Sequence, residues 1–153
     1  TVDNTIIELI YSIFEALYSS AGTDINLSFE DLQTVFQYKG KFTIAVSEKN
    51  GVDTLNEAIR EAMKFPLCDD VDILNASCIL LILKVHPNYS YGEMQKATNM
   101  LNIKNDISVI LAILTDSSLD INYVRVTLIA TGFNKVINEA VNNTSYNGHK
   151  NGN

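Results

Sequence analysis

Two uninterrupted apolar runs of strand length constrain the fold of this chain more than any other feature. The runs SCILLILKV and ISVILAIL occupy residues 77–85 and 107–114, and Pro87 follows the first of them. The first run, with branched apolar side chains over the length of a strand, predicts a buried strand, and the second run predicts another apolar strand. A helix-like pattern over residues 91–101 separates the two runs. This order favours parallel pairing, because parallel strands need a long crossover connection.

A further strand is predicted over residues 122–131, where two different faces alternate. Val126, Leu128 and Ala130 share one of these faces. The strand is expected to stop at Gly132, since glycine adopts backbone angles that other residues avoid. Arg125 interrupts the apolar pattern, so its guanidinium is expected to reach an edge of the sheet or to meet a carboxylate.

Hydrophobic periodicity and turn residues predict the remaining elements, which are helices over residues 3–20, 29–38, 52–64 and 133–142 and a strand over residues 41–48. Asp3 is the expected N-cap of the first helix, and Gly22 its expected stop. A turn at residues 115–118 separates the last two strands. They are therefore expected to form an antiparallel hairpin, although an offset pairing over a longer connection also fits.

The element order predicts an α+β fold, a two-layer domain with a four-stranded mixed β-sheet covered by helices and preceded by a long helix. The chain has 153 residues, of which 46% are hydrophobic, and this is enough for one core. The predicted organisation is a helix and loop over residues 1–27, a domain over residues 28–142 and a disordered tail over residues 143–153.

The first helix carries more apolar side chains than one sheet can cover, and so an exposed apolar stripe is expected there. The side chains in question are Ile6, Ile7, Leu9, Ile10, Ile13, Phe14 and Leu17.

Charge and cysteine usage exclude several classes of function. The net charge is -7 and no basic patch is present, which argues against binding to nucleic acid. No apolar run approaches the roughly 20 residues that span a bilayer. Cys68 and Cys78 lack metal-ligand spacing and are expected to be reduced cysteines of a cytoplasmic protein. Asp69, Asp70 and Asp72 form an acidic turn without the glycine and the distal glutamate of a calcium loop.

Several local sequences, taken in order, resemble one protein family. From about residue 3 to residue 134 the chain resembles the second half of the FtsZ-like bacterial tubulins. The matching sequences are NLSFEDL at 26–32, KGKFTIAV at 39–46, GVDTLNEAIREAMKFPL at 51–67 and VRVTLIATGF at 124–133. The first helix then corresponds to the family's long central helix, which links its two domains. The resemblance implies a polymerising cytoskeletal GTPase that acts in cell division or in plasmid or phage DNA segregation.

The resemblance also implies where the nucleotide is bound. The family binds GTP through a glycine-rich loop of its first domain, and the seven glycines of this chain all stand singly. GTP or GDP, with Mg²⁺ as a candidate ion, is therefore expected in a domain that this chain lacks. Self-association into filaments is expected to run through that GTP-binding domain, and this chain alone is expected to be inactive.

The loop after the first helix carries chemistry in this family. There an asparagine and two acids, spaced Asn-X-Asp-X-X-Asp, enter the nucleotide site of the next subunit and orient the attacking water. Asn26, Ser28 and Asp31 take these three positions and are the candidate catalytic residues. Ser28 departs from the family pattern, because a hydroxyl can hydrogen-bond to water but cannot accept a proton at neutral pH.

The residues themselves leave other interpretations open. Ser28 and Asp31 also fit a capping pattern, in which Ser28 is the N-cap and Asp31 reaches back to it. The two interpretations are compatible, since a capped helix end holds Asp31 rigidly.

Two other functions also fit the predicted fold, because a non-enzymatic interaction module and a small-ligand or metabolic domain would have a similar two-layer shape. A glycine-rich phosphate loop upstream would favour the GTPase.

Overall fold

The computed structural model describes residues 2–19, 24–64, 71–101 and 106–133. Every predicted element that falls in these ranges is present, with its ends shifted by no more than a few residues. The predicted helix over 133–142, apart from its first residue, the stop at Gly22 and the tail over 143–153 lie outside the described residues. The elements are α1 (Val2–Tyr18), α2 (Phe29–Phe36), β1 (Phe42–Asn50), α3 (Thr54–Lys64), η1 (Ile73–Asn75), β2 (Cys78–Val85), α4 (Tyr91–Leu101), β3 (Ser108–Thr115) and β4 (Tyr123–Thr131).

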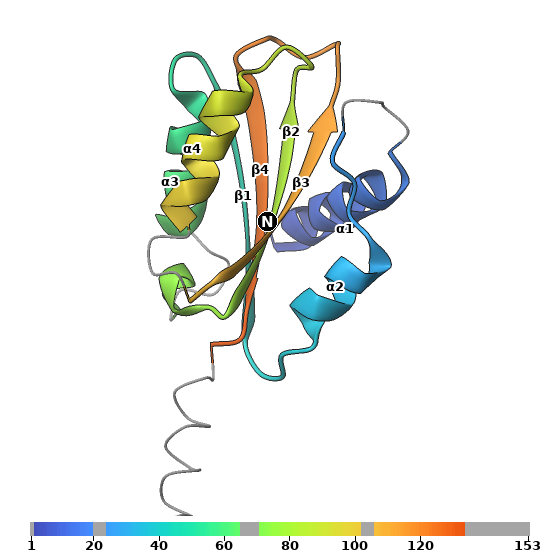
Figure 1. Cartoon of the computed structure of the whole chain (residues 1–153), viewed down its shortest axis with the longest axis vertical. Coiled ribbons are helices and arrows are strands. Elements are labelled where there is room, and N and C mark those ends of the chain that lie inside the picture. Colours follow the sequence, from blue (N-terminus) through green and yellow to red (C-terminus); the bar gives the residue numbers. More distant parts are fainter. Residues whose placement is uncertain (1, 20–23, 65–70, 102–105, 134–153) are drawn as a thin grey trace, which may run out of the picture.

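The strands form one mixed sheet in the order β1-β4-β2-β3, with helices on both of its faces (Figure 1). Helices α3 and α4 cover one face, and α1 and α2 lie against the other. Strands β2 and β3 run parallel and are joined through α4, whereas β4 is antiparallel to both of its neighbours. The predicted α+β fold with a four-stranded mixed sheet is thus confirmed.

The predicted hairpin between the last two strands is wrong. Strand β3 pairs with β2, whereas β4 lies between β1 and β2. The connection over residues 116–122 passes the end of β2, where the backbone N–H of Asp116 donates to the carbonyl of Val85 at 3.0 Å. Burial explains this order, because β4 is buried along nearly its whole length and β3 is half-exposed. The strand that is buried on both faces lies at the centre of the sheet, and the half-exposed strand lies at its edge, although β3 is the more continuously apolar of the two in sequence.

Strand β4 contributes to the core on both faces of the sheet. Val126 and Leu128 pack beneath α3 and α4, and Ile129 packs on the face that α1 and α2 cover. Leu128 lies opposite Ala45 on one side and Leu81 on the other. Side chains of this kind each stabilise the fold by about 1.5–3 kcal/mol when fully buried.

The end of β4 is fixed by a close contact between chain segments. Gly132 follows the strand with a φ of 79°, which confirms the predicted stop. Its carbonyl accepts a hydrogen bond from the buried hydroxyl of Ser77 at 2.7 Å. The hydroxyl of the preceding Thr131 donates to the carbonyl of Val35 at 2.8 Å, which joins the strand end to α2.

Helix α1 contacts the sheet through a narrow face, and the rest of the helix surface is exposed. Leu9 and Ala16 are buried, whereas Ile7, Phe14 and Tyr18 are 50%, 56% and 66% exposed. The rings of Phe14 and Tyr18 stack with their centroids 6.2 Å apart. An exposed apolar stripe is therefore present, but of the predicted residues Leu9 is buried, and Ile13 and Leu17 are partly buried against the core.

The predicted N-cap of α1 is wrong. The helix already includes Val2, so Asp3 lies within the first turn. A carboxylate at this position still favours the helix, because it faces the positive end of the helix dipole.

Two buried serines give opposite predictions for stability. The hydroxyl of Ser47 has no hydrogen-bond partner among the described residues, whereas that of Ser77 is bonded to the carbonyl of Gly132. Ser77→Ala is expected to lower the free energy of unfolding by about 1–3 kcal/mol, since it leaves that carbonyl unpaired. Ser47→Ala should leave it unchanged or raise it by about 1 kcal/mol. Urea denaturation measures both variants, and a larger loss for Ser47→Ala would contradict the assignment.

Candidate functional site

The segment between α1 and α2 runs along the free edge of β3. Ile25 and Ile113 exchange two backbone hydrogen bonds of 3.0 and 2.9 Å, which form a short antiparallel bridge. The N–H of Leu27 donates to the carbonyl of Ala16 at 2.9 Å, and the Leu27 side chain is buried. The loop is thus bound to the edge strand on one side and to α1 on the other.

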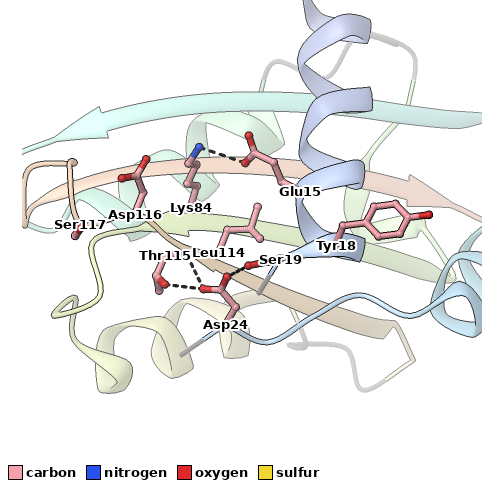
Figure 2. A pocket seen from close by; sticks show the side chains of 9 residues that line it. All are labelled: Glu15, Tyr18, Ser19, Asp24, Lys84, Leu114, Thr115, Asp116 and Ser117. Atoms are coloured by element: carbon pink, nitrogen blue, oxygen red, sulfur yellow. Dashed lines mark hydrogen bonds and ion pairs between the residues drawn. The ribbon is translucent and has the colours of Figure 1, made fainter. Parts of the chain in front are cut away.

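Asp24 anchors the start of this loop through its carboxylate (Figure 2). Oδ1 accepts hydrogen bonds from the backbone N–H of Thr115 at 2.7 Å and from its hydroxyl at 2.6 Å. Oδ2 accepts a hydrogen bond from the hydroxyl of Ser19, just after α1. Both carboxylate oxygens are therefore used to join the end of α1 to the end of β3.

The three predicted site residues follow this anchor. Asn26 is exposed, and its Nδ2 donates to the carbonyl of Ser19 at 2.9 Å. Ser28 is exposed and Asp31 half-buried at the start of α2. Among the described residues, Ser28 and Asp31 are hydrogen-bonded to each other, and no hydrogen bond joins Asn26 to either.

The predicted capping pattern at α2 is confirmed. Ser28 has extended backbone angles, and its hydroxyl accepts a hydrogen bond from the N–H of Asp31 at 3.0 Å. In return, Oδ2 of Asp31 accepts from the N–H of Ser28 at 2.9 Å. Within the described ranges, Oδ1 of Asp31 accepts no hydrogen bond. One carboxylate oxygen is thus fixed by the cap, and the other can accept a hydrogen bond from water.

A cleft of about 500 Å³ lies beside the loop, between the end of α1 and the ends of β2 and β3 (Figure 2). Lys84 Nζ lies 3.2 Å from Oε2 of Glu15, and Nη2 of Arg125 lies 3.9 Å from the same oxygen. The expectation that Arg125 meets a carboxylate is thus confirmed. On the rim of the cleft, hydrogen bonds from the hydroxyl and the backbone N–H of Ser118 lower the pKa of Asp116.

The described glycines and the described metal-ligating side chains are both scattered. Gly40, Gly51 and Gly132 have positive φ angles but lie at three separate strand ends, so these glycines build no phosphate loop. No group of three potential metal ligands occurs in the described ranges. Asp72 accepts from the N–H of Leu74 and caps η1, while Cys68, Asp69 and Asp70 lie outside these ranges. Within the part of the chain that the structure covers, no helix has both the length and the apolar character needed to cross a membrane.

Sequence analysis missed Asp24 because its partner is distant. Thr115 lies 91 residues further along the chain, at the end of a strand whose pairing edge the sequence does not specify. A single acidic residue in a loop carries no periodic or motif signal. The contact between Asp24 and Thr115 depends on the position of β3 at the edge of the sheet.

Comparison with known protein families gives a match over most of the domain. The C-terminal domain of the FtsZ family matches residues 40–134. The cell division protein FtsZ of Helicobacter pylori strain J99 is 29% identical over 141 residues, which cover 91% of this chain and 36% of that protein. Cell division protein FtsZ 1 of Archaeoglobus fulgidus is 31% identical over 110 residues, which cover 71% of this chain and 29% of that protein. The chain thus spans about a third of the length of these relatives.

Solved structures with the same fold agree with this match. An empty FtsZ dimer from M. jannaschii superposes with a TM-score of 0.72 and 25% identity, over 86% of this chain and 38% of that one. TubZ of Bacillus thuringiensis serovar israelensis, solved as GDP-form protofilaments, has a TM-score of 0.62 and 11% identity over 95% of this chain and 42% of that one. The second likeness concerns the fold alone.

Proposed function

Since the chain belongs to the FtsZ family, whose C-terminal domain it contains, we propose that it is the C-terminal part of a polymerising GTPase. In this proposal, residues 24–31 form the loop that completes the GTPase site of the neighbouring subunit in a filament. Asn26 and Asp31 supply acceptor oxygens for the attacking water, and Ser28 holds Asp31 in place. GTP is bound by the domain that precedes this chain.

One observation carries the proposal, namely that the loop is fixed while its polar side chains stay accessible. Asp24 and Ile25 are bonded to β3, and Leu27 is bonded to α1. The capping bonds fix Asp31 and leave its Oδ1 without a partner among the described residues. A group that orients water must lie within hydrogen-bond reach of it and must be held there by its surroundings.

The exposed side of α1 supports the idea that another domain precedes this one. Ile7, Ile10, Tyr11 and Phe14 line an apolar groove of about 340 Å³ on the helix. Exposed apolar surface of this kind usually marks an interface. In the proposed protein this face packs against the GTP-binding domain.

The relatives support filament formation as the setting of this chemistry. Two of the proteins compared above carry the name cell division protein, and TubZ was solved as protofilaments. We therefore place the protein in the cytoplasm as a filament-forming protein of cell division or of DNA segregation. A non-enzymatic interaction module is the alternative, and the measurement below separates the two.

Ser28→Asp tests the catalytic interpretation by restoring the family's usual acid. Aspartate is also a good N-cap, so the cap of α2 should survive. A second carboxylate beside Asp31 is expected to raise GTP turnover per filament subunit by about tenfold, a modest part of what a positioned acid–base group contributes. Turnover is measured as phosphate release from filaments of the full-length protein.

Ser90→Asp provides a matched control for this substitution. The hydroxyl of Ser90 accepts a hydrogen bond from the N–H of Glu93 at 3.3 Å, at the start of α4. It thus has the same capping role as Ser28 on a different helix. Turnover should not change in this variant. If Ser28→Asp gives the same turnover as Ser90→Asp, position 28 does not take part in the chemistry.

A further inference from the structure

Asp24 and Ser19 form a chain of contacts that ends on a proposed site residue. The carboxylate of Asp24 accepts a hydrogen bond from the hydroxyl of Ser19, and the carbonyl of Ser19 accepts one from Nδ2 of Asn26. Ser19 is thus held by its side chain and in turn holds the side-chain amide of Asn26. The orientation of Asn26 therefore depends on Asp24, although no direct hydrogen bond joins the two side chains in the described structure.

The other carboxylate oxygen of Asp24 fixes the loop relative to the sheet. Oδ1 receives both donors of Thr115, at 2.7 and 2.6 Å. Next to it, Ile25 bonds to Ile113 through two backbone hydrogen bonds. Two consecutive loop residues are therefore attached to two positions of β3 that lie on either side of Leu114.

We propose that Asp24 is a positioning residue, which fixes Asn26 through Ser19 and fixes the loop to β3 through Thr115. Its role is to present the acceptor oxygens of the loop to the neighbouring subunit's nucleotide in a single geometry. This inference rests on the proposed function. Asp24 itself takes no part in the chemistry in this scheme, and its carboxylate serves to hold Ser19 and Thr115 within the subunit.

The hydrogen-bond chemistry predicts which substitutions preserve the role. In Asp24→Asn, the amide oxygen can accept both bonds from Thr115. The amide nitrogen can then donate to the hydroxyl of Ser19, which accepts as readily as it donates. In Asp24→Ala every one of these bonds is lost. The asparagine variant should therefore resemble the wild type, and the alanine variant should not.

The test measures steady-state GTP hydrolysis by filaments of the full-length protein. Asp24→Ala is expected to lower kcat by about 10–100-fold, since displacing a catalytic group by about 1 Å can have an effect of this size. The KM for GTP should stay within about twofold, because another domain binds the nucleotide. Asp24→Asn should retain kcat within about threefold of the wild type. Asp72→Ala removes a comparable aspartate-to-backbone bond at η1 and should leave kcat unchanged.

Amide hydrogen exchange in the same full-length protein gives a readout that is independent of activity. In Asp24→Ala the amides of Ile25 and Leu27 should exchange at least about tenfold faster, because local opening becomes easier. In Asp24→Asn they should exchange at nearly the wild-type rate. If exchange rises in Asp24→Ala while kcat is unchanged, the loop is anchored but its position does not matter, and the inference is overturned. Equal loss of kcat in both variants would also overturn it.

Asp31→Asn in parallel separates the inference from the proposed function. If Asp31→Asn slows turnover and Asp24→Ala does not, the positioning role is wrong and the proposed function stands. If Asp31→Asn leaves turnover unchanged, the proposed function fails and the positioning role fails with it.

Discussion

Replacing Asp31 by asparagine is expected to slow GTP hydrolysis in assembled filaments by about 10²–10⁴-fold, the usual contribution of a positioned acid–base group. Asparagine keeps an oxygen that can accept the hydrogen bond from the N–H of Ser28, so the cap of α2 is preserved. It cannot accept a proton as the carboxylate can. Binding of GTP and assembly should remain, and the filaments should live longer. Phosphate release and light scattering, recorded on the same sample, measure both properties.

Two further variants separate catalysis from capping at this position. Asp31→Ala removes the carboxylate together with its capping bond from the N–H of Ser28. It should therefore also lower stability by about 1 kcal/mol, which Asp31→Asn should not do. Glu30→Gln neutralises the neighbouring carboxylate, which takes no part in the cap, and should leave turnover unchanged. If Asp31→Asn changes turnover by less than about threefold, far below the effect of losing an acid–base group, the loop has no catalytic role.

Gly132→Ala is expected to reduce the free energy of unfolding by about 3 kcal/mol. An added Cβ would lie 2.6 Å from Cβ of Ser77 and 3.1 Å from Cδ1 of Tyr38. A φ of 79° also disfavours any residue with a Cβ. Left-handed backbone conformation costs about 1–2 kcal/mol, and overpacking adds about 1–3 kcal/mol. Urea denaturation of the chain measures the loss as a lower midpoint with an unchanged slope.

Gly51→Ala is the matched control for the steric part of this effect. Gly51 has a φ of 135°, and no atom lies within 4 Å of the position that its Cβ would take. The substitution therefore adds backbone strain without a clash and should lower stability by about 1–2 kcal/mol. Equal losses in the two variants would show that the contact between Gly132 and Ser77 is not tight in solution.

The strands were predictable from sequence because each is a short segment between turn residues that is either continuously apolar, as in β2 and β3, or alternating, as in β1 and β4. The positions of β2 and β3, and their parallel pairing through α4, followed from such runs. The position of β4 in the sheet could not be predicted in this way, because the short connection between β3 and β4 favoured a hairpin of these two strands. What decides its place is burial on both faces, and alternating polar residues such as Thr127 conceal this in the sequence. Thr127 is buried, and its hydroxyl lies 3.3 Å from that of Ser12 on α1.

The candidate site was predictable only where its residues are neighbours in sequence. Ser28 and Asp31 lie three residues apart, so the capping pattern could be read directly and is present. The contacts of Asp24 with Thr115 could not be read, because they depend on which strand forms the edge of the sheet. The catalytic roles of Asn26, Ser28 and Asp31 stay predictions that the kinetic variants test.

The central position of β4 also sets an order of events during synthesis. In the described sheet, β1 pairs with β4 alone, and β2 is connected to β1 only through β4. A growing polypeptide that has not yet reached Tyr123 therefore holds an unpaired β1 and a separate β2–β3 pair. Distant pairings of this kind form slowly, because loop-closure entropy is lost before the contacts stabilise the chain. The two halves of the domain should consequently become stable together, when the last described strand enters the middle of the sheet as it leaves the ribosome.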